Sequence, residues 1–142
     1  MQLLLSDLLG LDGIEVETYQ ARGNSLVLEV EARSESSTCP RCGKVSSSLH
    51  QNHGHLVRDL DISGRQVWLK VNRRQFKCKT CQKPFSEVLE FVGKRMSYTN
   101  RLAERIVQEV IHSDVSNVAR HHGLSEDVVW SMVESVSKKT QN

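Results

Sequence analysis

All four cysteines of the chain fall into two pairs whose partners are separated by two residues. The pairs are Cys39-Pro-Arg-Cys42 and Cys78-Lys-Thr-Cys81, and 35 residues lie between Cys42 and Cys78. Two thiolates with this spacing can turn toward one point, and two such pairs that face each other complete a zinc tetrahedron. Because four thiolates close the coordination sphere, we expect one structural zinc and not a catalytic ion.

Other uses of paired cysteines need a setting that this chain does not indicate. A redox-active CxxC pair sits in a thioredoxin-like βαβ unit, and no such pattern surrounds either pair. Structural disulfides belong to oxidising compartments. The apolar start Met1–Leu11 lacks the basic residues of a secretory signal and includes Asp7, so we expect a cytoplasmic protein. No apolar run approaches the roughly 18 residues of a membrane span, so no membrane partner is expected.

Three histidines between the cysteine pairs are further candidate ligands. His50 and His53 fall in Val45–Gly54, a stretch rich in Ser and His that we expect to be a loop, and His55 follows it. A closed structural site takes four ligands, which the cysteines already supply. We therefore expect the histidines to stay off the metal, and their role is left open, with a phosphate contact as one alternative.

Charge is distributed unevenly although the net formal charge is only +2. Residues 1–38 hold two basic and seven acidic side chains, and residues 106–142 hold three and five. The segment between them, residues 39–105, holds fourteen basic and five acidic side chains. A basic block between acidic flanks favours a polyanionic partner, and we expect double-stranded DNA. The alternative is that these side chains only solvate a β-surface.

Apolar periodicity predicts a short helix and a β-hairpin at the start of the chain. Leucines throughout Leu3–Leu11 form the helix, which Gly10 and Gly13 end. Apolar and polar residues then alternate in Ile14–Gln20 and again in Leu26–Ala32, on either side of a Gly-Asn turn. The two alternating runs predict an antiparallel pair.

A second pair of β-patterned runs precedes the second cysteine pair. His55–Ile62 and Arg65–Phe76 flank the dipeptide Ser63-Gly64, a short break that is typical of a hairpin turn. The hairpin allows the two distant cysteine pairs to meet.

From Leu102 the apolar period changes to that of a helix, and three helical segments follow. The first ends at Ser113-Asp114, and the second, Val115–His122, is stopped by Gly123. Ser125 caps the third, Glu126–Ser137. Two helices joined by a tight glycine corner predict a helix-turn-helix whose second helix enters the major groove. The alternative is a plain helical hairpin that packs against another element.

These elements predict an α+β fold, in which a small β-rich zinc ribbon with an N-terminal hairpin is followed by a C-terminal three-helix helix-turn-helix. We expect an N-terminal helix and hairpin over residues 1–35 and the four-cysteine zinc ribbon over residues 36–92. The helix-turn-helix follows over residues 93–138, and residues 139–142 are expected to form a disordered tail.

Candidate DNA contacts come from the basic block and from the last two helices. Glu126 and Asp127 repel phosphates, although either could accept a hydrogen bond from cytosine N4. Trp130 could contact a thymine methyl group or belong to the core. The expected contacts are Arg65, Lys70, Arg73, Arg74, Lys94, Arg95, Arg101, Arg105, Arg120, Ser125, Trp130 and Ser131.

The two modules in this order resemble the N-terminal part of transposases of the ISL3 insertion-sequence family. The resemblance rests on Cys39-Pro-Arg-Cys42-Gly43, on Val57–Arg65, on Asn72–Cys78 with Cys81, and on Phe85-Ser-Glu87. It covers roughly residues 36–137, and the helix-turn-helix follows at the expected place.

The resemblance implies zinc-dependent binding to the terminal inverted repeats of a mobile element. It also implies a following RNase H-like catalytic domain, in which three acidic residues hold two divalent metals. Because the chain stops at Asn142, we expect a truncated transposase or half of a split reading frame, associated with the nucleoid and not itself an enzyme.

Another class of function is a protein-interaction adaptor or a repressor. Its partner would be a full-length transposase or a second copy of the chain, and the leucine-rich start and the acidic hairpin favour this role for residues 1–35. A nuclease fits poorly because no motif supplies clustered acids or an open metal site, and no small-molecule substrate is expected.

Overall fold

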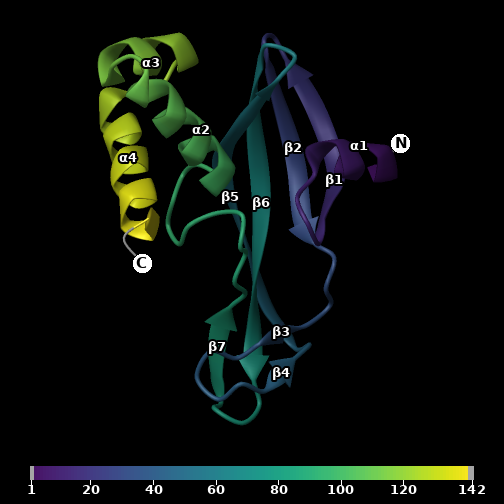
Figure 1. The fold of residues 1–142 in the computed structure, drawn as a ribbon. Helices are drawn as coiled ribbons and strands as arrows, with labels where there is room; N and C mark the ends of the chain where they lie inside the picture. Colours follow the sequence, from purple (N-terminus) through teal and green to yellow (C-terminus); the bar gives the residue numbers. More distant parts are fainter. Residues whose placement is uncertain (1, 141–142) are drawn as a thin grey trace.

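The longest element of the fold is a β-hairpin made of β5 (Leu49–Ile62) and β6 (Arg65–Cys78) (Figure 1). The computed structural model describes residues 2–140, and the side chains of residues 5–139. The hairpin turns at Ser63 and Gly64, whose φ angles are 53° and 76°. Two consecutive positive φ angles give a turn whose twist matches that of the paired strands. The predicted second hairpin is therefore confirmed.

The prediction of a loop over Val45–Gly54 is wrong. This stretch contains β4 (Val45–Ser46), which pairs with β3 (Ser37–Thr38), and the first part of β5. His53 pairs with Arg73 across the hairpin. The backbone N–H and C=O groups along β6 need partners, and the early part of β5 supplies them. Its polar side chains are exposed, and polarity alone does not distinguish such an edge strand from a loop.

Five strands form one sheet around β6. The strand order is β1-β2-β6-β5, and β7 (Lys83–Ser86) also pairs with β6. The predicted first hairpin is confirmed as β1 (Ile14–Arg22) and β2 (Ser25–Ala32). Because β2 lies parallel to β6, the sheet crosses the boundary expected between residues 35 and 36.

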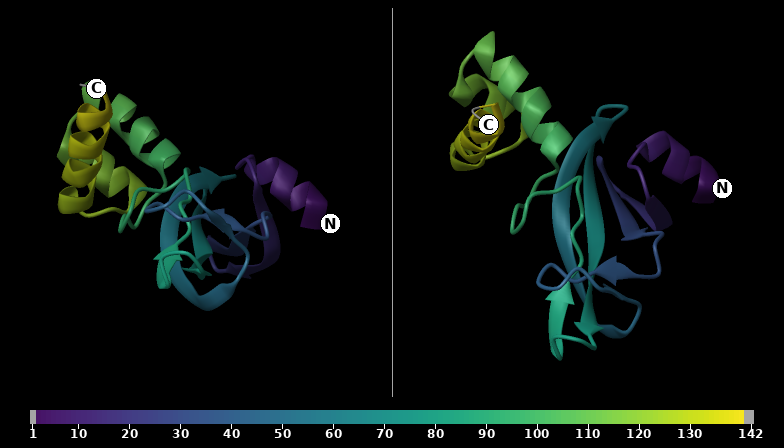
Figure 2. Two further views of the ribbon diagram at one scale, coloured as in Figure 1. Left: turned by 90° about the horizontal axis from the view of Figure 1, so that it is seen from below. Right: turned by 60° about the horizontal axis from the view of Figure 1, so that its bottom comes forward.

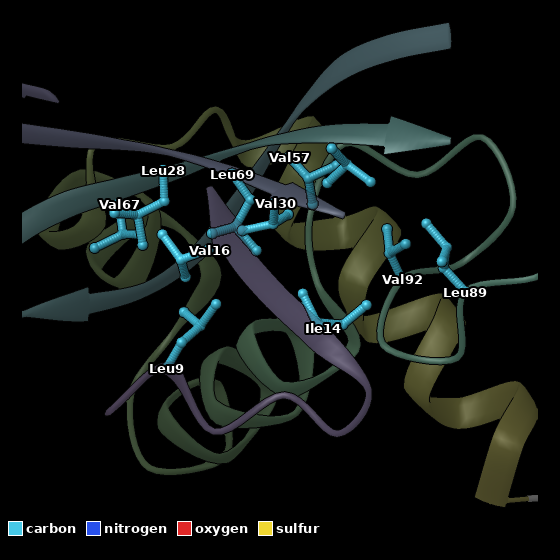
Figure 3. Close-up of a cluster of buried hydrophobic side chains, with 11 residues drawn as sticks. Leu9, Ile14, Val16, Leu28, Val30, Val57, Val67, Leu69, Leu89 and Val92 are labelled. Carbon is cyan, nitrogen blue, oxygen red and sulfur yellow. The ribbon is translucent and has the colours of Figure 1, made fainter. Parts of the chain in front are cut away.

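One face of this sheet carries the larger apolar core. The predicted N-terminal helix is present as α1 (Gln2–Leu9), and Leu9 packs with strand residues such as Val16 and Leu69 (Figure 3). Leu89 and Val92 close the same core from the segment that leads to the helical unit. This packing holds the first hairpin, the long hairpin and the connecting segment together by apolar burial.

Three helices form a second core beside the sheet: α2 (Asn100–Ile111), α3 (Val115–His122) and α4 (Glu126–Thr140). The Thr99 side chain caps α2 by accepting from the Leu102 N–H. Gly123 ends α3 in the left-handed region with a φ angle of 66°, as its position in the sequence predicts. The fold is thus α+β, with the helical elements in the expected order.

Buried charged residues join the helical unit to the sheet. The Arg58 Nη2 atom donates to the His122 carbonyl at 3.0 Å, at the corner between α3 and α4. Asp59, which is 1% exposed, accepts from Thr99 Oγ1 at 2.8 Å and from Arg101 Nε at 2.9 Å. These contacts fix α2 and the α3–α4 corner to β5, on the side of the sheet that Figure 2 shows away from α1.

A second buried ion pair lies between the sheet and the segment that follows β7. The Arg74 Nε and Nη2 atoms donate to the two oxygens of Glu87 at 2.9 and 3.0 Å. Arg74 Nη2 also donates to the Ser34 carbonyl at 2.6 Å, and the guanidinium lies 5.1 Å from the centre of the Phe76 ring. The side chains of Arg74 and Glu87 are 9% and 5% exposed, so this pair is part of the core.

Within residues 2–140, no helix has the length and apolar character that crossing a lipid bilayer requires.

Replacing Glu87 tests whether this buried pair supports the fold. We expect Glu87→Gln to lower the free energy of unfolding of the zinc-loaded protein by about 3–5 kcal/mol, because the buried Arg74 guanidinium loses its bidentate partner and keeps Glu31, 3.6 Å away, as its remaining counter-ion. Urea unfolding followed by circular dichroism measures the loss. Glu134→Gln is the matched control, because Glu134 pairs with Lys138 at the surface and should change the same quantity by less than about 1 kcal/mol. Equal losses in both variants would contradict a structural role for Arg74.

Candidate metal centre and nucleic-acid interface

Two turns of similar backbone geometry carry the four cysteines. In the first, the Gly43 N–H donates to the Cys39 carbonyl at 2.9 Å, and Gly43 has a φ angle of 77°. In the second, the Gln82 N–H donates to the Cys78 carbonyl at 2.8 Å, and Gln82 has a φ angle of 60°. Each turn directs its two thiols toward the other turn. A positive φ is strained for a side chain such as that of Gln82, so this conformation depends on the surrounding contacts.

The four sulfur atoms fit one zinc ion. Cys39 Sγ lies 4.0 Å from Cys81 Sγ, Cys42 Sγ lies 3.5 Å from Cys78 Sγ, and all four atoms are within 4.8 Å of one another. Zn–S bonds of about 2.3 Å in a tetrahedron place the sulfurs roughly 3.8 Å apart. The separations are too long for a disulfide, whose sulfurs lie about 2.05 Å apart. The ribbon therefore has a four-thiolate site for one structural zinc, as the cysteine spacing predicts.

The surroundings of the thiols shift the pKa values of Cys39 and Cys42 in opposite directions. Burial raises the pKa of Cys39, but hydrogen bonds from the backbone of Cys42 and Arg41 outweigh it and lower the pKa to about 6. The Lys44 backbone lowers the pKa of Cys42, but burial and the other three thiols outweigh that bond and raise it to about 11. A divalent cation would replace the protons that these thiols share.

This end of the sheet buries too few apolar side chains to form a core without the zinc site. Cys39 and Cys78 are buried with Phe76 and Phe85, whose ring centroids lie 6.1 Å apart. Arg41 covers the site by donating to the carbonyls of β7 at 3.1 and 3.2 Å, and contacts with the thiolates raise its pKa. Small domains with so few buried side chains commonly depend on a metal for stability.

The histidines lie outside the metal site. Among the described residues, the possible metal ligands that converge are the four cysteines alone. His50, His53 and His55 all lie on β5, and His53 is exposed opposite Arg73. Partial burial lowers the pKa of His55, and the charges of Arg73 and His53 lower it further.

The start of α4 presents the residues predicted to read bases, with one exception. Ser125 is exposed, and its Oγ atom accepts from the Val128 N–H as a helix cap. Trp130 is 58% exposed, so the structure places it at the surface and not in the core. Ser131 is half-buried and lies 2.7 Å from the hydroxyl of Tyr98, which ties α4 to the segment before α2.

The basic residues predicted to contact DNA divide into free and engaged side chains. Arg65, Lys94, Arg95, Arg105 and Arg120 are exposed. Lys70, also exposed, lies 3.5 Å from Glu29 across the sheet, and Arg120 bonds to Asn117 on its own helix. Arg73 is half-buried.

Two of the residues predicted to contact DNA form ion pairs within the fold. Arg74 is buried against Glu87, and Arg101 is bonded to Asp59 and, through Nη1, to the Leu9 carbonyl at 2.8 Å. Both were assigned from the basic block alone, and a charge count cannot show that a guanidinium is already neutralised within the fold.

Arg58 and Asp59, which position the helical unit, were not among the predicted functional residues. Arg58 and Asp59 sit in a predicted strand, where adjacent charged residues normally suggest an exposed surface. The available signal was the Arg-Asp-Leu-Asp pattern within an otherwise apolar run, but that pattern does not identify Thr99 and Arg101 as partners.

Comparisons with known proteins match both modules. Residues 35–81 match the family described as zinc-finger of transposase IS204/IS1001/IS1096/IS1165, and residues 87–137 match the helix-turn-helix domain of transposase family ISL3. The transposase for insertion sequence element IS1001 of Bordetella parapertussis is 32% identical over 127 residues. The alignment covers 89% of the chain and 30% of the relative, so the chain spans less than a third of that protein. No solved structure matches the chain.

Metal analysis tests the assignment of ligands. We expect one zinc per purified chain, its loss in Cys39→Ser, and a lower thermal midpoint for that variant because the small core around Phe76 loses its metal. Elemental analysis and a thermal melt measure both effects. His53→Ala is the control and should keep one zinc per chain, so a loss of zinc in this variant would show that a histidine is a ligand.

Zinc affinity should fall as the pH falls. Zinc binds thiolates, and Cys42, with its pKa near 11, is protonated at neutral pH, so metal binding must displace a proton there. Competition with a chromophoric chelator across a series of buffers measures the dependence. An affinity that does not change between mildly alkaline and mildly acidic buffer would contradict coordination by these thiols.

Proposed function

We infer that the chain, which belongs to the ISL3 family of transposases by its zinc-ribbon and helix-turn-helix segments, binds the terminal inverted repeats of its mobile element. DNA binding as such follows from the two modules. The choice of the repeats as the target is our proposal, and it draws on the named function of the IS1001 relative. The observation that carries it is the exposed Trp130 beside the capped start of α4, on a helical unit that the sheet holds in place.

The start of α4 has the chemistry to distinguish bases. The N-terminal part of the second helix in a helix-turn-helix lies against base edges in the major groove. There Trp130 offers an apolar surface for a thymine methyl group, and the carboxylates of Glu126 and Asp127 can accept from cytosine N4. These acids repel phosphates, so the affinity of the complex must come from basic residues outside α4.

Exposed arginines near the α3–α4 corner are suited to hold the flanking phosphates. Arg120 lies in the last turn of α3, just before Gly123. Arg65 is the first residue of β6 and precedes Gln66. The side-chain amide of Gln66 would lie 2.9 Å from a Cβ atom placed on Gly123, so this end of the hairpin is close to the same corner. Arg105 lies on the exposed side of α2. We assign phosphate contacts to these three arginines and none to Arg74 or Arg101.

The zinc ribbon lies at the end of β6 opposite to the helix-turn-helix and stabilises that strand. Cys78 ends β6, while Gln66, near its start, lies beside the α3–α4 corner. Metal binding orders the distal end of the strand, and the Arg58 and Asp59 contacts orient the helices at the proximal end. The proposed role of these modules is recognition of DNA, without a chemical step.

A second candidate role is contact with another protein through the N-terminal side. Leu8 on α1 is 72% exposed and Tyr19 on β1 is 52% exposed. β1 is also a terminal strand of the sheet, with one backbone edge unpaired within it. A second copy of the chain or a full-length transposase is the proposed partner, and the chain would then act as an adaptor or repressor. Light scattering of the wild type and of Leu8→Glu tests self-association, and a monomer in both would contradict the homodimer.

Binding measurements on two duplexes test the sequence-specific function. We expect tighter binding to the terminal repeat than to a scrambled duplex of equal length, measured by fluorescence anisotropy. Trp130→Ala should weaken binding to the repeat by about 1–3 kcal/mol and leave the scrambled duplex unchanged, because a base contact is lost. Arg120→Gln should weaken both complexes, since phosphate contacts carry no sequence information. Equal, weak binding of the wild type to both duplexes would refute the proposed target.

A further inference from the structure

A cleft of about 420 Å³ lies between the first cysteine turn and the segment that connects β7 to α2. Its basic lining residues are Arg41 from the turn, Arg73 from β6 and Lys94 from the connecting segment. Three cations from separate parts of the chain therefore meet at one concave surface.

The charges in this cleft are not balanced by the groups around it. Glu87 is the acidic residue of the lining, and both of its oxygens are bonded to Arg74. Arg41 already donates to two carbonyls of β7 and interacts with the thiolates of Cys39 and Cys81. Arg73 and Lys94 are therefore the cations that remain for a ligand.

Arg73 carries a donor without a partner. Its Nε atom is buried and makes no hydrogen bond within the described part of the chain. A buried donor that lacks an acceptor is unfavourable, so this side chain gains by turning Nε toward an acceptor in the cleft. The planar guanidinium presents Nε and Nη donors in a fork that matches two oxygens of a phosphate. Among the described residues, Lys94 is exposed and forms no ion pair, so it can add a third donor.

A tight turn holds Lys94 at the cleft. The Met96 N–H donates to the Gly93 carbonyl at 3.1 Å, and Arg95 has a φ angle of 64°. A Cβ atom at position 93 would lie 2.7 Å from Met96 Cγ, so a side chain at position 93 would displace Met96. The segment that carries Lys94 is thus shaped by close packing at this turn.

We propose that this cleft binds a phosphate group of the DNA backbone through Arg73 and Lys94, as a second anchor apart from the helix-turn-helix. The assignment rests on the proposed function, because the duplex is the polyanion that the helical unit brings to the molecule. Arg73 lies seven positions after Gln66 on β6, and Gln66 is beside the α3–α4 corner, so the strand rises about 23 Å between them. That length is about two thirds of a DNA helical turn, so the anchor reaches a phosphate outside the segment read by α4.

Salt dependence of binding to an arbitrary duplex tests the anchor. The probe is a fluorescent duplex three helical turns long, because a phosphate contact does not depend on sequence. The plot of log affinity against log salt concentration has a negative slope. We expect the magnitude of this slope to be smaller by about one to two in Arg73→Gln/Lys94→Gln, since each phosphate contact contributes about 0.9 to it. Lys94→Gln alone should lower this magnitude by about one and leaves the interior of the fold untouched.

Two control variants separate this anchor from the helix-turn-helix. Lys138→Gln removes one exposed charge in the last turn of α4, where Glu134 already pairs with it, and should leave the slope unchanged. If Arg120→Gln weakens binding while Lys94→Gln and the double variant behave as wild type, the anchor is refuted and the proposed function stands. A wild type that binds neither this duplex nor the terminal repeat refutes both.

Ethylation interference locates the contact on the DNA. Some phosphates should block binding of the wild type when they are ethylated, but not binding of the folded, zinc-loaded double variant. We expect these phosphates to lie outside the base pairs that Trp130 contacts. Interference patterns that are identical for the wild type and the double variant would overturn the proposal. That result would also be obtained if the cleft held free phosphate and not the duplex.

Discussion

The backbone pairing of β6 is the constraint on which the rest of the structure depends. This strand pairs with β2, β5 and β7, and its two ends carry different functions. Cys78 closes it at the metal site, while Gln66 lies against the corner between α3 and α4. A single continuous strand therefore sets the separation between the zinc ribbon and the helix-turn-helix. The apolar core on one face of the sheet holds that strand in place, because α1, the first hairpin and the connecting segment all pack on it.

The two ends of the molecule are stabilised by different means. At the helical end, apolar side chains such as Ile106 and Met132 are fully buried, and capped helices close the unit. At the ribbon end, two phenylalanines and two cysteines form the buried part of the apolar cluster, and metal coordination adds the stability that so small a cluster cannot provide. The buried Arg74 combines both kinds of contact, because it forms an ion pair with Glu87 and stacks on Phe76 of the ribbon cluster.

Local features of the sequence were sufficient for much of this structure. Cysteine spacing predicted the zinc ligands, the Ser63-Gly64 break predicted the long hairpin, and Gly123 marked the corner of the helix-turn-helix. Each of these signals acts over a few residues. The parallel pairing of β2 with β6 joins segments about 40 residues apart, and no local pattern reports such a contact. The same limit explains why the ion pairs of Arg74 and Arg101 were not predicted, because their counter-ions come from other elements. The exposed edge of β5 was missed because its composition is that of a loop.

The position of Arg101 has a consequence for how the molecule opens. Its guanidinium, on α2, bonds at once to Asp59 of β5 and to the carbonyl at the end of α1. Local unfolding of α2 would therefore release the end of α1 and leave a carboxylate buried without its cation. Such an opening is unfavourable, so amide protons at the junctions of α1, β5 and α2 should exchange with solvent in one cooperative event. The two cores would then behave in solution as a single folding unit.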